Sequence, residues 1–282
     1  MFQISIHNKT LIFDRPALMG ILNVTPDSFS DGGRFNQMDK ALRHCEQMIA
    51  DGADFIDIGG CSTRPNNAIA TESEEMERVI PILKTVRKTF PETLVSIDTF
   101  RKNVAEACIN EGADLINDIS GGLFDKEMLT YIGKNHIPYV MMHCVGTPET
   151  MHQYALDGNI HQTVLDFFKQ QCEVLEAYGE QQIILDPGIG FGKSLEANYQ
   201  LLSNLSCYRY NNFPILIGIS RKSLINKVLH TTPDTAENGT TVLNTIALLN
   251  GADILRVHDV KNAREAIELV GSFRNFAAKL DS

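Results

Sequence analysis

The chain has 282 residues, 43% of them hydrophobic and 21% charged, and a formal net charge of −10. This length suits either two ordinary domains or one large α/β barrel, and no apolar run approaches the roughly 18 residues that a membrane-spanning helix needs. The acidic balance argues against nucleic acid or an anionic membrane as a partner, because both select basic surfaces.

The N-terminal segment "MFQISIHNKTLIF" alternates apolar and polar residues, which predicts strands and lacks the basic and apolar regions of a signal peptide. The six cysteines form no Cys-x-x-Cys pair and show no regular spacing. In an acidic chain without a secretion signal, we expect reduced thiols rather than a disulfide framework. We therefore expect a soluble, cytoplasmic protein.

Three segments resemble one another: "DGADFIDIGG" from Asp51, "EGADLINDISGG" from Glu111 and "NGADILRVHDV" from Asn250. In each, a glycine follows a helical pattern, where its tolerance of positive φ suits the residue just past a helix end. A short apolar strand follows and ends in polar residues. Before the first copy, apolar side chains fall on one helical face at Met38, Ala41, Leu42, Cys45, Met48 and Ile49.

Reading outward from these segments predicts eight short apolar strands, at 17–24, 54–59, 94–98, 114–118, 138–143, 182–186, 214–220 and 253–258. Amphipathic helical stretches separate them, for instance Glu72–Phe90, Ile160–Tyr178 and Val260–Ala278. Apolar strands that alternate with helices indicate a parallel sheet covered on its faces. Eight such units favour an α/β fold of the (β/α)8 TIM-barrel type over an open doubly wound sheet. We expect residues 1–282 to form one such domain, with the first 13 residues as a β-hairpin that closes the barrel bottom.

Nearly every predicted strand ends in a polar or charged residue, and the active site of a TIM barrel lies at these carboxyl ends. A single polar strand end is ordinary because it meets water, but a ring of them around one mouth is what a ligand pocket requires. The strand ends and following loops supply Asn23, Arg64, Asp98, Asn117, His143, Asp186, Lys222, Arg256 and His258.

The residue types in this ring indicate the ligand. Asp98, Asn117 and Asp186 offer acceptors for a flat heterocycle with several N–H groups, and a carboxylate can accept two parallel hydrogen bonds from such an edge. The arginines, the lysine and a histidine of the same set gather positive charge despite the acidic total. The combination predicts a substrate with a neutral heterocycle at one end and a phosphate group at the other.

Three loops at the predicted mouth are distinctive. Residues 23–35 and 59–67 are rich in Gly, Ser, Thr and Pro; ordinary turns share this composition, but the position at the mouth favours lids that order around a substrate. The stretch "DPGIGFGKS" (186–194) resembles a phosphate-binding loop without fitting it. Pro187 occupies the first required glycine position, and Lys193 the last glycine of a dinucleotide fingerprint.

Taken in order, these motifs resemble dihydropteroate synthase, a family of the folate pathway. The match covers almost the whole chain, through "MGILNVTPDSFSDGG", "DFIDIGG-STRP", "VSIDT", "INDISG", "VMMH", "LDPGIGFGK", "GISRKS" and "RVHDV". The resemblance implies condensation of 6-hydroxymethyl-7,8-dihydropterin diphosphate with p-aminobenzoate, giving 7,8-dihydropteroate and diphosphate. It also implies Mg²⁺ as the cofactor, a homodimer formed through helices near the C-terminus, and sulfonamides as competitors of p-aminobenzoate.

The resemblance assigns roles to individual residues. It implies that the pterin is held by Asp98, Asn117, Asp186 and Lys222 and lies against Ile119, Met142 and Gly218. It implies that p-aminobenzoate contacts Thr63, Pro65, Phe191, Lys222 and Ser223, with Arg64 close by. It implies Asn23 as the Mg²⁺ ligand, diphosphate binding by Arg256 and His258, and a catalytic part for Asp98, Lys222 and Arg256.

The reaction itself needs no nucleophilic residue. Cleavage of the C–O bond leaves negative charge on the diphosphate, which a metal ion and cationic side chains stabilise. It leaves positive charge on the pterin methylene, which carboxylates such as Asp98 stabilise. We therefore expect a dissociative step, followed by attack of the poorly basic aniline.

Two positions depart from the family pattern "GGESTRPG". Cys61 stands where the family has Glu, and Asn66 stands where it has Gly. A neutral thiol cannot accept the hydrogen bonds that a carboxylate can, and Asn adopts positive φ less freely than Gly. The closed shape of the loop 59–67 therefore follows from the resemblance less directly than the pterin slot does.

Three other functions compete with this one. A pterin-dependent methyltransferase shares the barrel but has no need of "STRP" or "SRKS". A zinc site would use Cys61, Cys144, His143 and His258, although their spacing is irregular and no short chelating pair exists. A non-catalytic pterin-binding paralogue would lose the diphosphate cations, but Arg256 and His258 are present.

Overall fold

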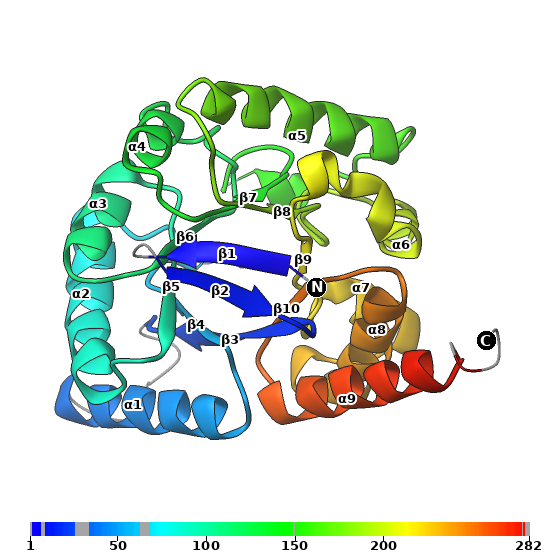
Figure 1. Ribbon diagram of the computed structural model, residues 1–282, viewed down its shortest axis with the longest axis horizontal. Helices are drawn as coiled ribbons and strands as arrows, with labels where there is room; N and C mark the ends of the chain where they lie inside the picture. The colour runs from blue at the N-terminus through cyan, green and yellow to red at the C-terminus, as the bar shows by residue number, and fades with distance from the viewer. Residues whose placement is uncertain are drawn as a thin grey trace.

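A computed structural model of the chain describes residues 2–6, 9–25, 34–62, 68–148, 150–277 and 279 (Figure 1). An antiparallel hairpin is formed by β1 (Phe2–Ile6) and β2 (Lys9–Phe13). The parallel strands are β3 (Ala17–Asn23), β4 (Phe55–Gly59), β5 (Leu94–Asp98), β6 (Leu115–Asp118), β7 (Tyr139–Met142), β8 (Ile183–Asp186), β9 (Leu216–Ile217) and β10 (Ile254–Val257).

Helices connect successive parallel strands and lie on the outside of the sheet (Figure 1). They are α1 (Arg34–Ala50), α2 (Glu72–Thr89), α3 (Lys102–Asn110), α4 (Met128–Asn135), α5 (Ile160–Glu176), α6 (Leu195–Ser203), α7 (Ser223–Leu229), α8 (Glu237–Leu249) and α9 (Val260–Ala277). Short 3₁₀ turns are η2 (Met151–Gln153), η3 (Leu205–Tyr208), η4 (Tyr210–Asn212) and η5 (Pro233–Thr235). None of the helices among the described residues is long and apolar enough to cross a membrane.

The eight parallel strands form a sheet in the order β8-β7-β6-β5-β4-β3-β10-β9, and its two ends meet. Leu185 N donates to Pro214 O at 2.9 Å, and a parallel bridge joins Leu185 to Ile215. The predicted TIM barrel is therefore confirmed, with its last seam nearly closed.

The predicted hairpin closes the bottom of the barrel, as Figure 1 shows for the blue strands lying across the ring. Its buried side chains Phe2, Ile4 and Ile6 pack against apolar residues from the amino-terminal halves of the parallel strands. Phe13 continues this packing, because its ring stacks on Phe2 at 4.6 Å and on Phe55 at 5.6 Å between centroids. A plug of apolar side chains therefore seals one end of the barrel.

Seven of the eight predicted strands agree with the structure within one residue at each end, and the three predicted helices within two. The exception is β9, which pairs only at Leu216 and Ile217 where 214–220 was expected. Pro214 has no N–H to donate, and the Lys222 N–H bonds back to Ile219 O at 3.0 Å in a turn. The chain therefore leaves the sheet early at this strand.

Candidate active site

The site is formed by side chains that alternate along each parallel strand between the inside and the outside of the barrel. Every second residue points into the barrel, and the lower inward residues belong to the apolar plug, for example Phe55, Leu115 and Ile184. The residues between them pack outward against the helices. The upper inward positions are mostly polar: Asn23, Asp57, Asp98, Asn117, Met142, Asp186, Gly218 and Arg256.

Arg256 lies between two carboxylates inside the barrel. Its Nε donates to Asp57 Oδ2 at 2.6 Å, and its Nη2 donates to Asp98 Oδ2 at 2.6 Å. Burial raises the pKa of Asp98 to about 7, against the charge of Arg256 and with a further contribution from the negative charge of Asp57. Asp98 therefore changes its protonation near neutral pH.

Asn117 is buried beside this pair, and its Nδ2 donates to Asp57 Oδ2 at 3.0 Å. The side chain of Asn23 lies near Asp98. A Cβ placed on Gly59 would meet Asp98 Oδ2 at 3.6 Å and Asn23 Oδ1 at 3.7 Å. The absence of a side chain at Gly59 therefore leaves a space faced by two oxygen atoms.

The loop 187–193 answers the question raised by its resemblance to a phosphate loop. The Lys193 ammonium turns inward and donates to the carbonyl oxygens of His143 at 3.0 Å, Gly188 at 2.8 Å and Phe191 at 3.1 Å. Burial lowers the pKa of Lys193 to about 7. A Cβ on Gly188, whose φ is +71°, would lie 1.9 Å from His143 O, so this turn requires glycine. The lysine stabilises the loop instead of facing an anion.

Asp186 stands at the start of this loop, buried at the end of β8, with its Oδ1 accepting from Gly188 N at 2.7 Å. Burial raises the pKa of Asp186, while Lys222 is the strongest charge that opposes the rise. The Lys222 Nζ donates to Ile189 O at 2.5 Å and lies 4.3 Å from the Phe191 ring centroid. Burial lowers the pKa of Lys222 to about 8, against the charge of Asp186.

Gly218 leaves room between two cations, because a Cβ there would lie 3.8 Å from both Arg256 Cβ and Lys222 Nζ. An apolar cluster forms another part of the mouth. It contains Ile119, Met142, Cys144 and Met151, with Phe100, Phe124 and Phe191 packed against it. The structure thus brings together Ile119, Met142 and Phe191, which the sequence assigns to the substrate slot.

His258, which follows β10, and Ser220, in the turn after β9, form a pair with Nδ1 and Oγ 2.9 Å apart. Next to Ser220, Arg221 adopts a left-handed φ of 59° and binds Asp259 at 2.7 Å through Nη2. Lys222 precedes α7 as its cap, and Ser223 is an exposed first residue of that helix. The "SRKS" motif therefore directs Lys222 inward and leaves Ser223 at the surface.

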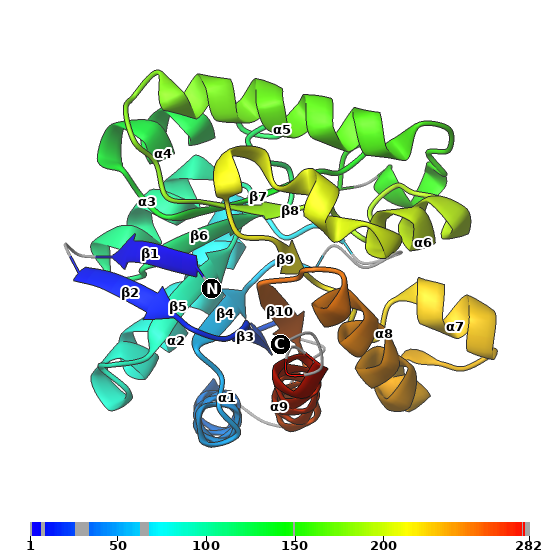
Figure 2. The same ribbon diagram turned by 45° about the vertical axis from the view of Figure 1, so that its right-hand side comes forward.

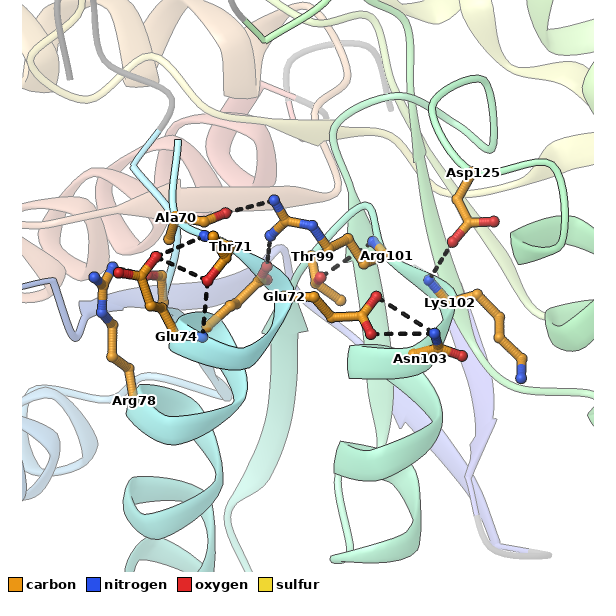
Figure 3. Close-up of polar contacts among 12 residues, drawn as sticks. Ala70, Thr71, Glu72, Glu74, Arg78, Thr99, Arg101, Lys102, Asn103 and Asp125 are labelled. Atoms are coloured by element: carbon orange, nitrogen blue, oxygen red, sulfur yellow. Dashed lines mark hydrogen bonds and ion pairs between the residues drawn. The ribbon is translucent and has the colours of Figure 1, made fainter. Parts of the chain in front are cut away.

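Figure 3 shows the contacts around Ala70 and Thr71, which follow the loop 59–67. Arg101 binds the buried Glu75 carboxylate through Nη1 and donates from Nη2 to Ala70 O at 2.5 Å. Thr71 and Glu74 form a reciprocal capping box that starts α2. On the other side of the loop, Arg78 Nη1 donates to Gly60 O at 2.9 Å. Both flanks of the loop are thus tied to α2 and to the turn before α3.

Cys61, the residue that replaces the family's Glu, is half-buried in this region. Burial and the negative charge of Glu75 raise the pKa of its thiol, so a neutral thiol is expected there. Thr63, Arg64, Pro65 and Asn66 lie outside the described residues, as do 26–33 of the first loop. Their predicted roles, and the lid behaviour predicted for both loops, stay predictions.

The sequence reasoning missed Asp57. The residue sits in the middle of the apolar run "DFIDIG", where it seemed part of a strand rather than part of a site. The available signal was alternation, because Asp57 points to the same side as Gly59 two residues later.

The zinc alternative finds no support in geometry: among the residues that the structure describes, no three His, Cys, Asp or Glu side chains are grouped as metal ligands.

Comparison with known proteins agrees with this arrangement. The model of the family described as pterin binding enzyme matches residues 19–258. Dihydropteroate synthase of Synechocystis sp. is 44% identical over 251 residues, which cover 88% of this chain and 86% of the relative. That of Escherichia coli is 40% identical over 263 residues, covering 93% of each. The chain belongs to the dihydropteroate synthase family.

Solved structures of the family share the fold. Dihydropteroate synthase from Clostridium difficile, determined in the presence of pteroic acid, is 40% identical with a TM-score of 0.86, covering 93% of this chain and 99% of that one. The Yersinia pestis enzyme in a sulfonamide drug complex is 40% identical with a TM-score of 0.89, covering 97% of this chain and 100% of that one. The family resemblance inferred from motifs is therefore confirmed.

Proposed function

We propose that the chain condenses 6-hydroxymethyl-7,8-dihydropterin diphosphate with p-aminobenzoate at the carboxyl-terminal mouth of its barrel. The single observation that carries this proposal is the set of upper inward residues, where acceptors, an apolar wall and cations lie at one end of the barrel above a sealed plug. The relatives are named as the enzyme of this reaction. A pterin-dependent methyltransferase and a non-catalytic paralogue are not favoured.

Pterin recognition rests on Asp98, Asn117 and Asp186. Their oxygens can accept from the ring N–H and amino groups, and the low exposure of Asn117 and Asp186 strengthens each hydrogen bond by excluding water. Met142 and Ile119 offer an apolar surface against which a flat ring packs. Lys222 lies between Asp186, on the pterin side, and the Phe191 ring, on the p-aminobenzoate side. We assign it contacts with both substrates.

The leaving diphosphate needs positive charge. We assign this part to Arg256 and His258, with Asn23 as the protein ligand of Mg²⁺. The donor set fits Mg²⁺, which prefers oxygen ligands and commonly takes few from the protein and the rest from substrate phosphates and water; Asn23 Oδ1 faces the space left by Gly59 beside Asp98. Bound Mg²⁺ would neutralise charge on the diphosphate oxygens.

The described residues support a dissociative reaction. The C–O bond breaks with both electrons leaving on diphosphate, and the cation on the pterin methylene is stabilised by the nearby Asp98 carboxylate. The amine nitrogen of p-aminobenzoate then bonds to the methylene and loses a proton to water. No side chain forms a covalent bond, so the protein binds, orients and supplies electrostatic stabilisation.

The test is p-aminobenzoate-dependent release of diphosphate by the purified protein. EDTA or Arg256→Ala should abolish turnover while bare pterin still binds in the presence of EDTA. Full activity without a divalent metal would remove Mg²⁺ from the proposal. Absence of turnover together with absence of pterin binding would contradict the function itself. A sulfonamide should compete with p-aminobenzoate in the same assay.

A homodimer is also proposed, formed through α8 and α9, which lie side by side in Figures 1 and 2. Large apolar side chains are exposed along one stripe of each helix: Val242, Ile246 and Leu249 on α8, and Leu269, Phe273 and Phe276 on α9. Their spacing of four and three residues places each set on one helical face. Exposed apolar stripes of this kind mark a protein–protein contact.

A further inference from the structure

Asp57 has an environment that demands an explanation. It is the third residue of β4, its side chain is fully buried at 0% exposure, and it points into the barrel between Phe55 and Gly59. Burying an ionised carboxylate is costly unless it is paired and hydrogen-bonded. The interactions that retain Asp57 should therefore matter to the molecule.

One oxygen of Asp57 serves two residues of the site. Its Oδ2 accepts from Arg256 Nε at 2.6 Å and from Asn117 Nδ2 at 3.0 Å. Arg256 in turn donates from Nη2 to Asp98 Oδ2 at 2.6 Å. Asp57 therefore links three residues, from three other strands, that the proposed function assigns to the substrate.

An ionised carboxylate accepts hydrogen bonds and donates none. The Asn117 amide must then present its NH₂ group to Asp57, which turns its carbonyl oxygen toward the other side, where an acceptor is needed for pterin N–H groups. The guanidinium of Arg256 is planar, so contacts to Asp57 and Asp98 through two different nitrogens fix its plane. Both orientations are set without Asp57 touching the substrate.

We infer that Asp57 is a positioning residue for substrate binding, which orients the amide of Asn117 for the pterin and the guanidinium of Arg256 for the diphosphate. The inference rests on the proposed function and adds a residue to it. Asp57→Asn keeps the shape but removes the charge that holds both donors. An Asn in this position can also turn its own NH₂ toward Asn117 and leave two donors facing each other.

Calorimetry with 6-hydroxymethylpterin, a bare pterin without diphosphate, tests the inference. Loss of a hydrogen bond to a charged group predicts that Asp57→Asn weakens binding by about tenfold or more. The matched control is Asp114→Asn, because Asp114 is also a buried carboxylate on an arginine, Arg87, but lies at the amino-terminal start of β6. The control should bind pterin within about twofold of the wild type.

A double-mutant cycle separates positioning from general structural loss. If Asp57 acts through Asn117, Asp57→Asn should cost at least about threefold less affinity when residue 117 is already Ala. The double variant Asp57→Asn/Asn117→Asp exchanges the two side chains, so one carboxylate again faces one amide. This variant tests the inference even if Asp57→Asn alone does not fold. It should bind pterin at least about fivefold more tightly than Asn117→Asp alone.

The outcomes distinguish the inference from the function on which it rests. Wild-type protein that binds no pterin would contradict the proposed function. If the wild type binds, then equal affinity in Asp57→Asn, an identical loss in the Asn117→Ala background, or no recovery in the exchange variant would each overturn the role given to Asp57.

Discussion

At the scale of single residues, Lys193 and Asp186 have different roles in the stretch "DPGIGFGKS". The Lys193 ammonium donates to three carbonyl oxygens, two in its own loop and one of His143. Its hydrogen bonds are therefore made within the protein and not to a ligand. Asp186 is buried at the strand end, with only Oδ1 accepting from Gly188 N among the hydrogen bonds described for it. The acid is therefore the group available to a ligand, and the lysine supports the turn.

Asp186→Asn tests this division. The substitution keeps the shape but makes one acceptor a donor that faces a pterin N–H, which should cost on the order of 2–4 kcal/mol, or roughly 30- to 1000-fold in pterin affinity. Calorimetry with pterin measures the loss, and ATP serves as the control ligand. Unchanged pterin affinity would refute the site, and ATP binding that disappears in Lys193→Ala would instead support a phosphate loop.

Asp98 predicts a pH dependence of pterin binding. Its pKa of about 7 is raised mainly by burial, and a protonated Asp98 can no longer accept two hydrogen bonds from the ring. Affinity should be full above about pH 8, about half of that at pH 7, and fall by up to about tenfold per pH unit at lower pH. Titrations between about pH 7.5 and 5.5 measure the slope, and Asp98→Asn should remove it. A flat profile in the wild type would show that binding does not need ionised Asp98.

Sequence alone predicted the site residues that lie at the ends of strands. It did not predict the polar residue that lies inside a strand, below the mouth. Asp98, Asn117 and Asp186 are the last or next-to-last residues of their strands, so their place at the mouth follows from topology alone. Asp57 lies two residues before the end of β4. The link between Asp57 and Arg256 spans 199 residues of sequence and exists only once the barrel brings β4 and β10 near each other.

At the scale of elements, α2 carries two arginine–carboxylate pairs, one at each end. Arg101 reaches Glu75 in the first turn of α2 near the mouth, and Arg87 in its last turn reaches Asp114, the residue just before β6. Helix periodicity predicted α2 itself. The pairs could not be predicted, because each partner lies in a different loop whose path depends on the finished barrel.

Removal of Arg101 should destabilise the protein in a pH-dependent way. Glu75 is fully buried, and loss of one partner of a buried ion pair costs about 3 kcal/mol in the free energy of unfolding. Burial already raises the pKa of Glu75, and the Thr99 hydrogen bond and the charge of Arg101 hold it down. In Arg101→Ala the pKa of Glu75 should rise further.

A carboxyl group whose pKa is higher in the folded state contributes stability that is lost as pH rises through that pKa. Urea unfolding of Arg101→Ala should therefore show a larger loss, relative to the wild type, at about pH 8 than at about pH 5. Addition of Glu75→Gln should return part of the stability at the higher pH. An equal loss at both values would mean that the Glu75 charge is not the cause.

At the scale of the whole molecule, a formal net charge of −10 coexists with cationic side chains gathered at the site. Arg256 and His258 lie at the end of β10 and Lys222 caps the start of α7, where each faces or adjoins site residues. Net charge alone therefore excludes nucleic-acid partners more reliably than it excludes a small anionic substrate. The fold as a whole was predictable because eight strand–helix units repeat a simple pattern, and the seam at β9 was the part that required the structure.

The exposed stripes of α8 and α9 predict the assembly of the whole molecule. Phe273 is 64% exposed between Leu269 and Phe276, and a charge at this position should prevent a second copy from packing there because burying it unpaired is costly. The wild type should sediment at about twice the 31.4 kDa chain mass, and Phe273→Glu at the chain mass. Ile12→Glu is the matched control, since Ile12 is 70% exposed on β2 and belongs to neither of these helices. A wild type that is a monomer at micromolar concentration would contradict the dimer. A Phe273→Glu variant that remains a dimer would place the contact elsewhere.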